Sequence, residues 1–308
     1  MKVLVTGGAG FIGRWVVKRF LDNGDNVIAI DNFSNGCRRN VSEFKENFEL
    51  IEGDICNKNL IEGAVEKVDL VLHLAAQIEV QDSLDRPEKS FTNNILGTFL
   101  TLEACRKHNK KFCIVGTCMV YDIASGEPIS EKHPTKPASP YAATKLAAEE
   151  LAISYFYSYN LPVVIVRPFN TYGPFQKTNM EGGVVSIFIK QFLKGENLKI
   201  FGDGTQTRDL LFVEDCADFI FKASTDNNAI GQIFNAGTGQ DISINGLAKL
   251  ICPDDSRIKH IEHHHPQSEV SKLLCDSNKT RELLGWRPMH TLKEGIEKTK
   301  EWVEANET

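Results

Sequence analysis

Short apolar runs alternate with amphipathic segments along the first two thirds of the chain. The runs are rich in β-branched residues, as buried strands are, and the segments between them have helical periodicity. Predicted strands cover Lys2–Val5, Asn26–Ile30, Leu50–Glu52, Leu70–Leu74, Lys111–Val115 and Pro162–Arg167; predicted helices cover Gly13–Asn23, Asn93–Asn109 and Pro140–Tyr159. This alternation predicts an α/β fold, a doubly wound parallel sheet with helices on both faces.

The pattern changes after Pro168, where Gly and Pro residues mark irregular chain. A helix over Val184–Lys194, a strand over Leu198–Phe201 and a final helix over Leu292–Glu304 are predicted beyond it. We expect a smaller, interleaved α/β domain. On this reading residues 1–169 bind a dinucleotide, 210–238 return to the first sheet, and 170–209 with 239–308 form a substrate-binding domain.

Composition excludes several classes of protein. The 308 residues contain 35 Lys and Arg against 41 Asp and Glu, a net charge of −6, so general nucleic-acid binding is not expected. No apolar run approaches the roughly 18 residues of a membrane span, and we expect no membrane association. The eight cysteines are scattered without any C-x-x-C pair, which favours reduced thiols and a cytoplasmic enzyme.

Three glycines follow the first predicted strand at a spacing of three residues. Gly7 allows a tight turn, Gly10 allows the backbone to approach a pyrophosphate, and Gly13 allows a helix to pack on a strand. The N-terminus of that helix offers free N–H groups and a partial positive charge to the phosphates. The loop therefore predicts a dinucleotide site, although a glycine-rich turn alone is also found in ordinary strand–helix connections.

An acidic residue ends the second predicted strand, 18 residues after Gly13. A carboxylate at Asp31 accepts hydrogen bonds from a ribose 2′-hydroxyl and repels a 2′-phosphate, which favours NAD over NADP. Arg38 and Arg39 lie nearby and leave a 2′-phosphate site open as an alternative, with an ordinary surface loop as the other explanation.

Ser139 and Pro140 form a good helix start, and Tyr141 and Lys145 then stand four residues apart on one face. An ammonium beside a phenol favours the phenolate, so we expect the pKa of Tyr141 to fall from about 10 and the residue to act as a general base. Thr117 follows the strand Lys111–Val115, at the edge where parallel sheets bind ligands.

Further motifs occur in a fixed order along the chain. They are T-G-G-A-G-F-I-G (6–13), G-D-I (53–55), H-L-A-A (73–76), N-I-L-G-T (94–98), S-P-Y-A-A-T-K (139–145), R-P-F-N-T-Y-G-P (167–174), F-G-D-G-T-Q-T-R-D (201–209) and L-L-G-W-R-P (283–288). This set resembles the extended short-chain dehydrogenase/reductase superfamily, in the nucleotide-sugar epimerase/dehydratase branch typified by UDP-glucose 4-epimerase. The resemblance covers nearly the whole chain and implies a Rossmann-type sheet.

The resemblance implies a role for each matching residue. The expected NAD-binding residues are Gly7, Gly10, Phe11, Ile12, Gly13, Asp31, Asn32, Asp54, Ile55, Ala75, Ala76, Tyr141 and Lys145. The expected catalytic residues are Tyr141, Lys145 and Thr117, with Cys118 as a candidate, and the expected substrate-binding residues are Ser83, Thr117, Asn170, Val184, Phe201 and Arg208. The implied substrate is a nucleotide-diphosphate sugar, a UDP-sugar first, and the implied assembly is a homodimer through helices beginning near Phe91 and Pro140.

One departure from the family bears on the reaction. Sugar 4,6-dehydratases follow the hydroxyl residue with Asp-Glu, whereas Thr117 is followed by Cys118 and Met119. Met119 cannot exchange a proton, which favours a 4-epimerase that oxidises C4 transiently to a 4-keto sugar and returns the hydride. Two alternatives stay open: an atypical dehydratase that uses Cys118 in place of the usual acid, and a non-catalytic NAD-binding sensor.

A second departure lies near the end of the chain. Relatives carry a diphosphate-binding Arg shortly before an acid in this region, whereas the sequence here reads His263-His264-His265-Pro266-Gln267-Ser268-Glu269. A histidine is one replacement, and a different nucleotide preference is another explanation. Adjacent histidines in a loop rarely converge on one ion, so we expect no metal site.

Overall fold

The computed structural model describes residues 1–122, 124, 127–178, 183–262 and 270–307. Within this part of the chain, seven parallel strands form one sheet in the order β10-β6-β5-β4-β1-β2-β3. The strands are β1 (Lys2–Thr6), β2 (Asn26–Asp31), β3 (Phe48–Glu52), β4 (Leu70–His73), β5 (Lys111–Val115), β6 (Val163–Pro168) and β10 (Ile233–Ala236). The doubly wound parallel sheet predicted from the sequence is confirmed, and its order reverses between β1 and β4, where such sheets bind ligands.

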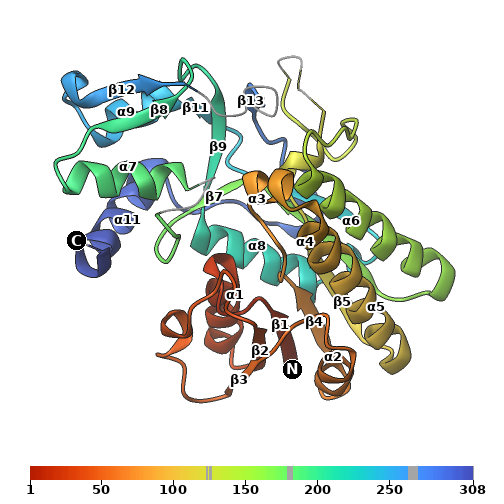
Figure 1. Ribbon diagram of the computed structural model, residues 1–308. Coiled ribbons are helices and arrows are strands. Elements are labelled where there is room, and N and C mark those ends of the chain that lie inside the picture. Colours follow the sequence, from red (N-terminus) through yellow and green to blue (C-terminus); the bar gives the residue numbers. More distant parts are fainter. Residues whose placement is uncertain (123, 125–126, 179–182, 263–269, 308) are drawn as a thin grey trace.

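Helices cover both faces of this sheet (Figure 1). Val3 and Val5 of β1 face one core, while Leu4 faces the other, which explains why the strands read as continuous apolar runs. The first core is covered by α1 (Phe11–Asp22) and α8 (Val213–Thr225), and the second by α2 (Lys58–Val65), α5 (Gly97–His108) and α6 (Pro140–Tyr159). Before α5 the chain forms α3 (Val80–Asp85), α4 (Pro87–Ser90) and the π-helical turn η2 (Phe91–Leu96).

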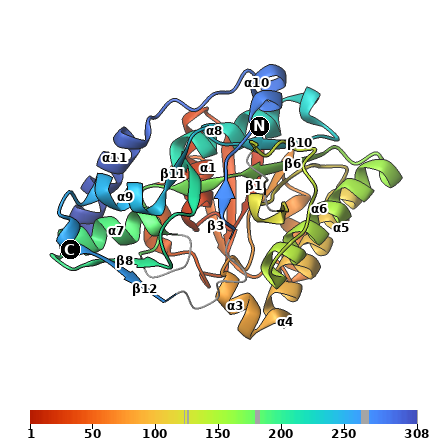
Figure 2. The same cartoon turned by 90° about the horizontal axis from the view of Figure 1, so that it is seen from above.

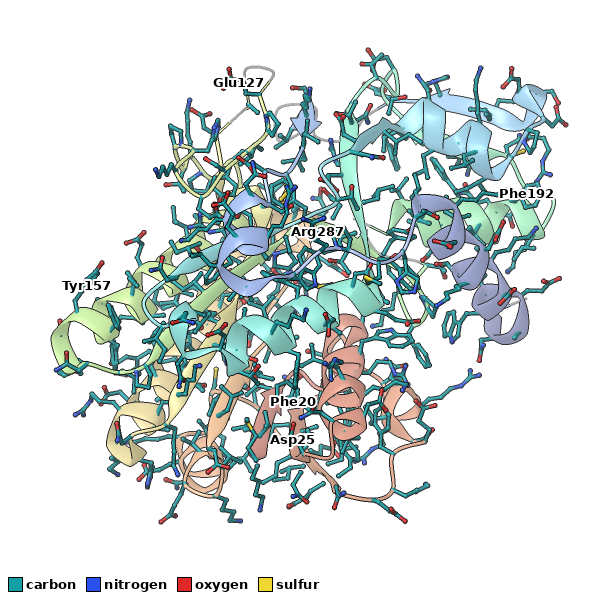
Figure 3. The ribbon with its side chains drawn as sticks, turned by 180° about the vertical axis from the view of Figure 1, so that it is seen from behind. Phe20, Asp25, Glu127, Tyr157, Phe192 and Arg287 are labelled. Atoms are coloured by element: carbon teal, nitrogen blue, oxygen red, sulfur yellow. The ribbon has the colours of Figure 1, made fainter. Side chains whose placement is uncertain are left out.

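A smaller lobe lies beyond the carboxyl ends of the strands (Figures 1 and 2). In one of its sheets β9 (Thr207–Phe212) pairs with β7 (Asn170–Tyr172), β11 (Asp241–Ser243) and β13 (Lys272–Leu273); β8 (Leu198–Phe201) pairs with β12 (Ile258–Ile261) in the other. Three helices, α7 (Val184–Leu193), α9 (Ile244–Ile251) and α11 (Leu292–Glu307), share its core. Phe192 lies in this lobe and Phe20 beneath α8 in the larger one (Figure 3).

The last third of the chain is divided between the two lobes. Strand β10 and helix α8 return to the large sheet, within the segment 210–238. Helix α10 (Asn278–Leu284) also packs against β10, and Trp286 is fully buried in the first core. The expectation that all of 239–308 belongs to the smaller domain is therefore wrong for α10 and Trp286, because this segment helps to cover the apolar surface beside β10.

The remaining short turns are η1 (Arg38–Val41), η3 (Cys118–Val120), η4 (Asn227–Ala229) and η5 (Asp255–Arg257). Among the helices described, none has the length and apolar character needed to cross a membrane.

Candidate active site

A cavity of about 340 Å³ lies at the carboxyl edge of the large sheet, between the two lobes. Its lining includes most of the residues that the sequence assigns to the cofactor and the reaction. From the expected set these are Gly7, Gly10, Phe11, Ile12, Gly13, Asp31, Asn32, Ile55, Ala75, Ala76, Thr117, Cys118, Tyr141, Lys145 and Asn170. Residues from seven parts of the chain thus converge on one cavity.

The glycine loop lies tightly against neighbouring backbone. Gly7 has a φ of 71°, and a Cβ there would lie 2.8 Å from the backbone nitrogen of Ala75. A Cβ on Gly13 would lie 2.0 Å from the Gly7 carbonyl oxygen, so α1 begins directly against the loop. The N-terminal end of α1, at Phe11, lines the cavity, and its partial positive charge suits a pyrophosphate site.

Asp31 is held firmly at the end of β2. Its carboxylate accepts hydrogen bonds from the backbone N–H of Ala9 (3.0 Å) and of Phe33 (2.8 Å). A Cβ on Gly36 would lie 2.7 Å from an Asp31 oxygen, so the loop needs a glycine there to pass the carboxylate. Burial raises the pKa of Asp31, and these backbone hydrogen bonds oppose that shift. A carboxylate lining the cavity at this point fits an adenosine ribose.

The two nearby arginines are engaged elsewhere. Arg38 pairs with Glu52 and stacks on the ring of Phe33, and Arg39 donates to the side chain of Asn306. Neither of them lines the cavity. The structure therefore gives no support to a 2′-phosphate site built from these arginines.

Asp54 contributes in a different way from the one expected. It does not line the cavity but accepts a hydrogen bond of 2.7 Å from Asn32, which does, and another of 2.8 Å from the N–H of Cys56. Ile55, the next residue in the chain, does line the cavity. Asp54 thus positions Asn32 at the adenosine end of the cavity.

Tyr141, Lys145 and Thr117 meet at the opposite end of the cavity. Ser139 caps α6 by accepting a hydrogen bond from the N–H of Ala142 (3.2 Å), which places Tyr141 and Lys145 on the first two turns. The side chains of Thr117 and Tyr141 are hydrogen-bonded to each other. Lys145 Nζ donates to the Val115 carbonyl oxygen at 2.6 Å, at the end of β5.

The expected direction of the Tyr141 pKa is wrong. Burial raises the pKa of Tyr141 to about 12, and the hydrogen bond with Thr117 only partly offsets this. Burial also lowers the pKa of Lys145 to about 8, against the opposing charge of Glu149. Desolvation is the largest cause of both shifts, because burial disfavours the charged phenolate and the charged ammonium alike.

Cys118 lies beside Thr117 and lines the cavity, although its side chain is buried. It belongs to an apolar cluster with Phe169, Val270 and Cys275. Burial raises the pKa of Cys118 to about 12, so the thiol keeps its proton at neutral pH. The thiol is therefore protonated at neutral pH and cannot act as a base, and its high pKa makes it a weak acid.

The expected substrate residues divide into two groups. Asn170 lines the cavity, and its buried side-chain oxygen Oδ1 has no hydrogen-bond partner in the part of the chain that the structure describes. Such an atom fits a ligand that donates a hydrogen bond. Ser83, Val184, Phe201 and Arg208 do not line the described cavity. Ser83 is buried and donates to the Val80 carbonyl oxygen (2.6 Å).

Arg208 is held by backbone carbonyl groups of the smaller lobe and does not line the cavity. The Arg208 guanidinium donates to the carbonyl oxygens of Thr207 (2.8 Å) and Val270 (2.7 Å), which fixes it at the junction of β9 and β13. His263, His264 and His265 lie outside the described residues. Among the residues that are described, no group of three or more His, Cys, Asp or Glu side chains is arranged to hold a metal ion.

A buried histidine and a buried ion pair lie behind the cavity, and the sequence did not reveal either of them. His73 makes hydrogen bonds to Thr6 (3.0 Å) and Thr98 (3.1 Å), and burial lowers its pKa to about 3, so it is neutral. Glu149 and Arg167 form a fully buried ion pair. His73, Thr98 and Arg167 each fall within a motif of the family resemblance, but nothing in the local sequence pairs them with their partners.

Comparison with known proteins agrees with this geometry. Residues 3–237 match the model of the NAD dependent epimerase/dehydratase family, and the chain belongs to that family. Its members are enzymes, and their cofactor is NAD, for which the glycine loop and Asp31 are suited.

The relatives include named epimerases. The UDP-glucose 4-epimerase of Mycolicibacterium smegmatis is 38% identical, over 98% of this chain and 98% of that protein. Among solved structures, Pal from Bacillus thuringiensis has a TM-score of 0.96 and 53% identity, with 99% of each chain covered. The UDP-glucose 4-epimerase of Thermotoga maritima, solved with UDP-glucose, has a TM-score of 0.92 and 33% identity, also with 99% of each chain covered. Nucleotide-sugar dehydratases and decarboxylases are among the relatives at 32–34% identity.

Proposed function

We propose that the protein is an NAD-dependent nucleotide-sugar 4-epimerase that acts on a UDP-sugar. The observation that carries the proposal is the meeting of Tyr141, Lys145 and Thr117 at one end of a cavity whose other end is built for a dinucleotide. The likeness to UDP-glucose 4-epimerases over the whole chain supports the choice of reaction and of nucleotide.

Each of the three residues has a definite task at the C4 hydroxyl of the sugar. Thr117 hydrogen-bonds to the hydroxyl and to Tyr141, so the proton has a direct path to the phenolic oxygen. Lys145, anchored on Val115, brings a positive charge that stabilises the phenolate form of Tyr141, which takes up the proton. When bound, NAD would supply the hydride acceptor for C4 and the positive charge of its nicotinamide ring. The proton that Tyr141 takes returns to the 4-keto oxygen when C4 regains its hydride on the other face.

The described cavity lining gives no carboxylate near Thr117 for removing water from the sugar. Asp31 is the acidic residue in that lining, and it lies at the adenosine end. Cys118 and Met119 occupy the positions where dehydratases carry Asp-Glu, and the Cys118 thiol is packed among apolar side chains. This arrangement favours epimerisation, which needs proton and hydride transfer at a single carbon.

A second candidate rests on the Cys118 thiol, which lines the cavity and keeps its proton. The thiol carries a proton within the reacting region, although its raised pKa makes it a weak acid, and an atypical dehydratase that uses Cys118 is the alternative. If Cys118→Ser and Cys118→Ala both keep full turnover, Cys118 has no part in the chemistry. The third alternative, a non-catalytic NAD-binding sensor, has less support because both Tyr141 and Lys145 are present in the cavity.

Product analysis separates these functions. The purified protein is incubated with UDP-, dTDP-, GDP- and CDP-sugars, and the mass and stereochemistry of the products are measured. An isomer of unchanged mass supports the epimerase, loss of water supports the dehydratase, and bound NAD with no turnover of any donor supports the sensor. Tyr141→Phe is expected to abolish turnover, and an active Tyr141→Phe enzyme would contradict the mechanism.

The proposal extends to assembly and location. Phe91, Leu96 and Phe99 on η2 and α5 are 58%, 39% and 40% exposed, which leaves an apolar surface beside α6. Pairing of α5 and α6 between two copies would cover it in a four-helix interface, so we propose a homodimer that light scattering can test. All eight cysteines are unpaired, which supports a reducing, cytoplasmic setting.

A further inference from the structure

A buried carboxylate lies directly behind the proposed catalytic pair. Glu149 follows Lys145 by one turn of α6 and is 1% exposed, and its partner Arg167 on β6 is 2% exposed. Arg167 donates from Nε (2.9 Å) and from Nη2 (2.6 Å), and both bonds end on the same oxygen, Oε2. The other oxygen, Oε1, is buried and receives no hydrogen bond from the residues that the structure describes.

The free oxygen lies against the backbone that supports the reaction. A Cβ on Gly116 would lie 1.8 Å from Oε1, so the carboxylate fills the space that any side chain at this position would need. Gly116 stands between Val115, whose carbonyl oxygen accepts the bond from Lys145, and Thr117, whose hydroxyl bonds to Tyr141. Oε1 is therefore packed under the segment of chain that joins both supports.

This arrangement is unusual for a purely structural ion pair. A pair that serves only packing gains most when both carboxylate oxygens are satisfied, because a buried oxygen without a donor costs free energy. Here Arg167 neutralises one side of Glu149, and the other side faces the reacting end of the cavity. A negative charge so placed stabilises a nearby ammonium and disfavours a nearby phenolate.

We propose that Glu149 is a positioning residue of this enzyme, the buried counter-charge that holds Lys145 as an ammonium and sets the pH at which the Tyr141–Lys145 pair loses its proton. The inference rests on the proposed roles of Tyr141 and Lys145. Arg167 keeps Glu149 ionised and limits the strength of its field. Gly116 is the residue that makes room for the carboxylate.

Other charged and titratable groups also surround the pair. Burial raises the pKa of Glu149 and the bonds from Arg167 oppose that shift, while His73 on β4 is neutral. Cys118 beside Thr117 keeps its proton. The groups that interact electrostatically with Tyr141, Lys145 or Glu149 are Cys118, His73, Arg167 and Glu150. Of these, Arg167 is the buried partner of Glu149, and Glu150 is exposed to solvent.

The test is a titration of Lys145 that needs no substrate. The NAD-loaded protein is labelled with [ε-¹³C]lysine, and the Lys145 resonance is identified by its absence in Lys145→Arg. We expect Glu149→Gln, which keeps the shape and removes the charge, to lower the titration midpoint of Lys145 by at least about half a pH unit. Glu150→Gln removes the same charge from the exposed face of the same helix and is expected to leave the midpoint unchanged.

A second variant keeps the test decisive if Glu149→Gln does not fold. Arg167→Lys offers Oε2 one ammonium in place of two guanidinium bonds, so Glu149 is less neutralised and the Lys145 midpoint is expected to rise. Glu149→Asp keeps the charge and is expected to leave the midpoint near that of the parent. Thermal unfolding and NAD content confirm that each variant is folded.

The rate profile gives an independent readout. With UDP-glucose as the probe, both limbs of the profile of kcat against pH are expected to move to lower pH together in Glu149→Gln. A merely structural defect would lower kcat at every pH and leave the positions of the two limbs unchanged. An unchanged Lys145 midpoint in Glu149→Gln, or in Arg167→Lys where Glu149→Gln does not fold, overturns the inference. An active Tyr141→Phe enzyme overturns the proposed function instead, so the two failures are distinguishable.

Discussion

Replacing Gly13 with alanine adds one methyl group at the point where α1 meets the glycine loop. The new Cβ would lie 2.0 Å from the Gly7 carbonyl oxygen and 2.9 Å from the Gly7 carbonyl carbon. Non-bonded heavy atoms prefer roughly 3.5 Å, so the loop and the helix must separate by more than about 1 Å. Both contacts are backbone atoms, which no side-chain rotation can relieve.

Two effects oppose each other in this variant. Alanine gains about 1 kcal/mol over glycine within a helix, whereas overpacking costs about 1–3 kcal/mol. We expect a net loss of stability of up to about 2 kcal/mol. Because the displaced loop is also the proposed pyrophosphate site, we expect the Kd for NAD to rise at least about tenfold, which corresponds to about 1.4 kcal/mol.

The assay compares Gly13→Ala with Gly63→Ala. Gly63 lies within α2, and a Cβ there would meet no atom within 4 Å, so the same methyl group is expected to raise stability by about 0.5–1 kcal/mol and leave NAD binding unchanged. Chemical unfolding gives the free energies and equilibrium dialysis gives the Kd. The reasoning is refuted if Gly13→Ala binds NAD as tightly as the parent and is no less stable.

Three other outcomes are expected. Asp31→Asn should reduce the preference for NAD over NADP, measured as the ratio of their Kd values, because the charge that repels a 2′-phosphate is gone; an unchanged ratio would show that Asp31 does not select the cofactor. Arg167→Met should lower the free energy of unfolding by about 3–5 kcal/mol, since Glu149 is left buried without its partner, and a loss under about 1 kcal/mol would contradict this. His73, with an unfolded pKa of about 6.5 and a folded pKa of about 3, binds a proton only on unfolding between these values, so stability is lost as pH falls below about 6.5. At pH 5 that loss is about 2 kcal/mol relative to pH 8, and it should be absent from denaturation curves of His73→Gln.

The large sheet and the cofactor loop were predictable because their signals are local. The inner strands of the large sheet are buried on both faces, so their apolar runs could be identified without knowing which strands pair. The spacing of Gly7, Gly10 and Gly13 and the position of Asp31 follow from the strand–loop–helix unit itself. Those residues line one cavity in the structure.

The smaller lobe was harder to predict, for a physical reason. Its strands are short: β7 and β11 have three residues each and β13 has two. Each of these strands forms by pairing with β9, and none is long enough to show an alternating apolar pattern in the sequence. The position of Ser83 was equally hard to predict from the sequence. Its hydroxyl donates to the backbone of its own helix, and the residue does not line the cavity.

The sequence by itself determined the family, the cofactor and most of the residues that line the cavity, because these depend on residue type at fixed spacing. Only the tertiary structure decided how those residues are charged. The pKa of Tyr141 rises rather than falls because the fold removes water from the phenol, and Glu149 lies under Gly116 because α6 packs on β5 and β6. Burial and contacts between residues far apart in the sequence determine the pKa values of Tyr141 and Lys145, and the Y-x-x-x-K spacing gives information on neither.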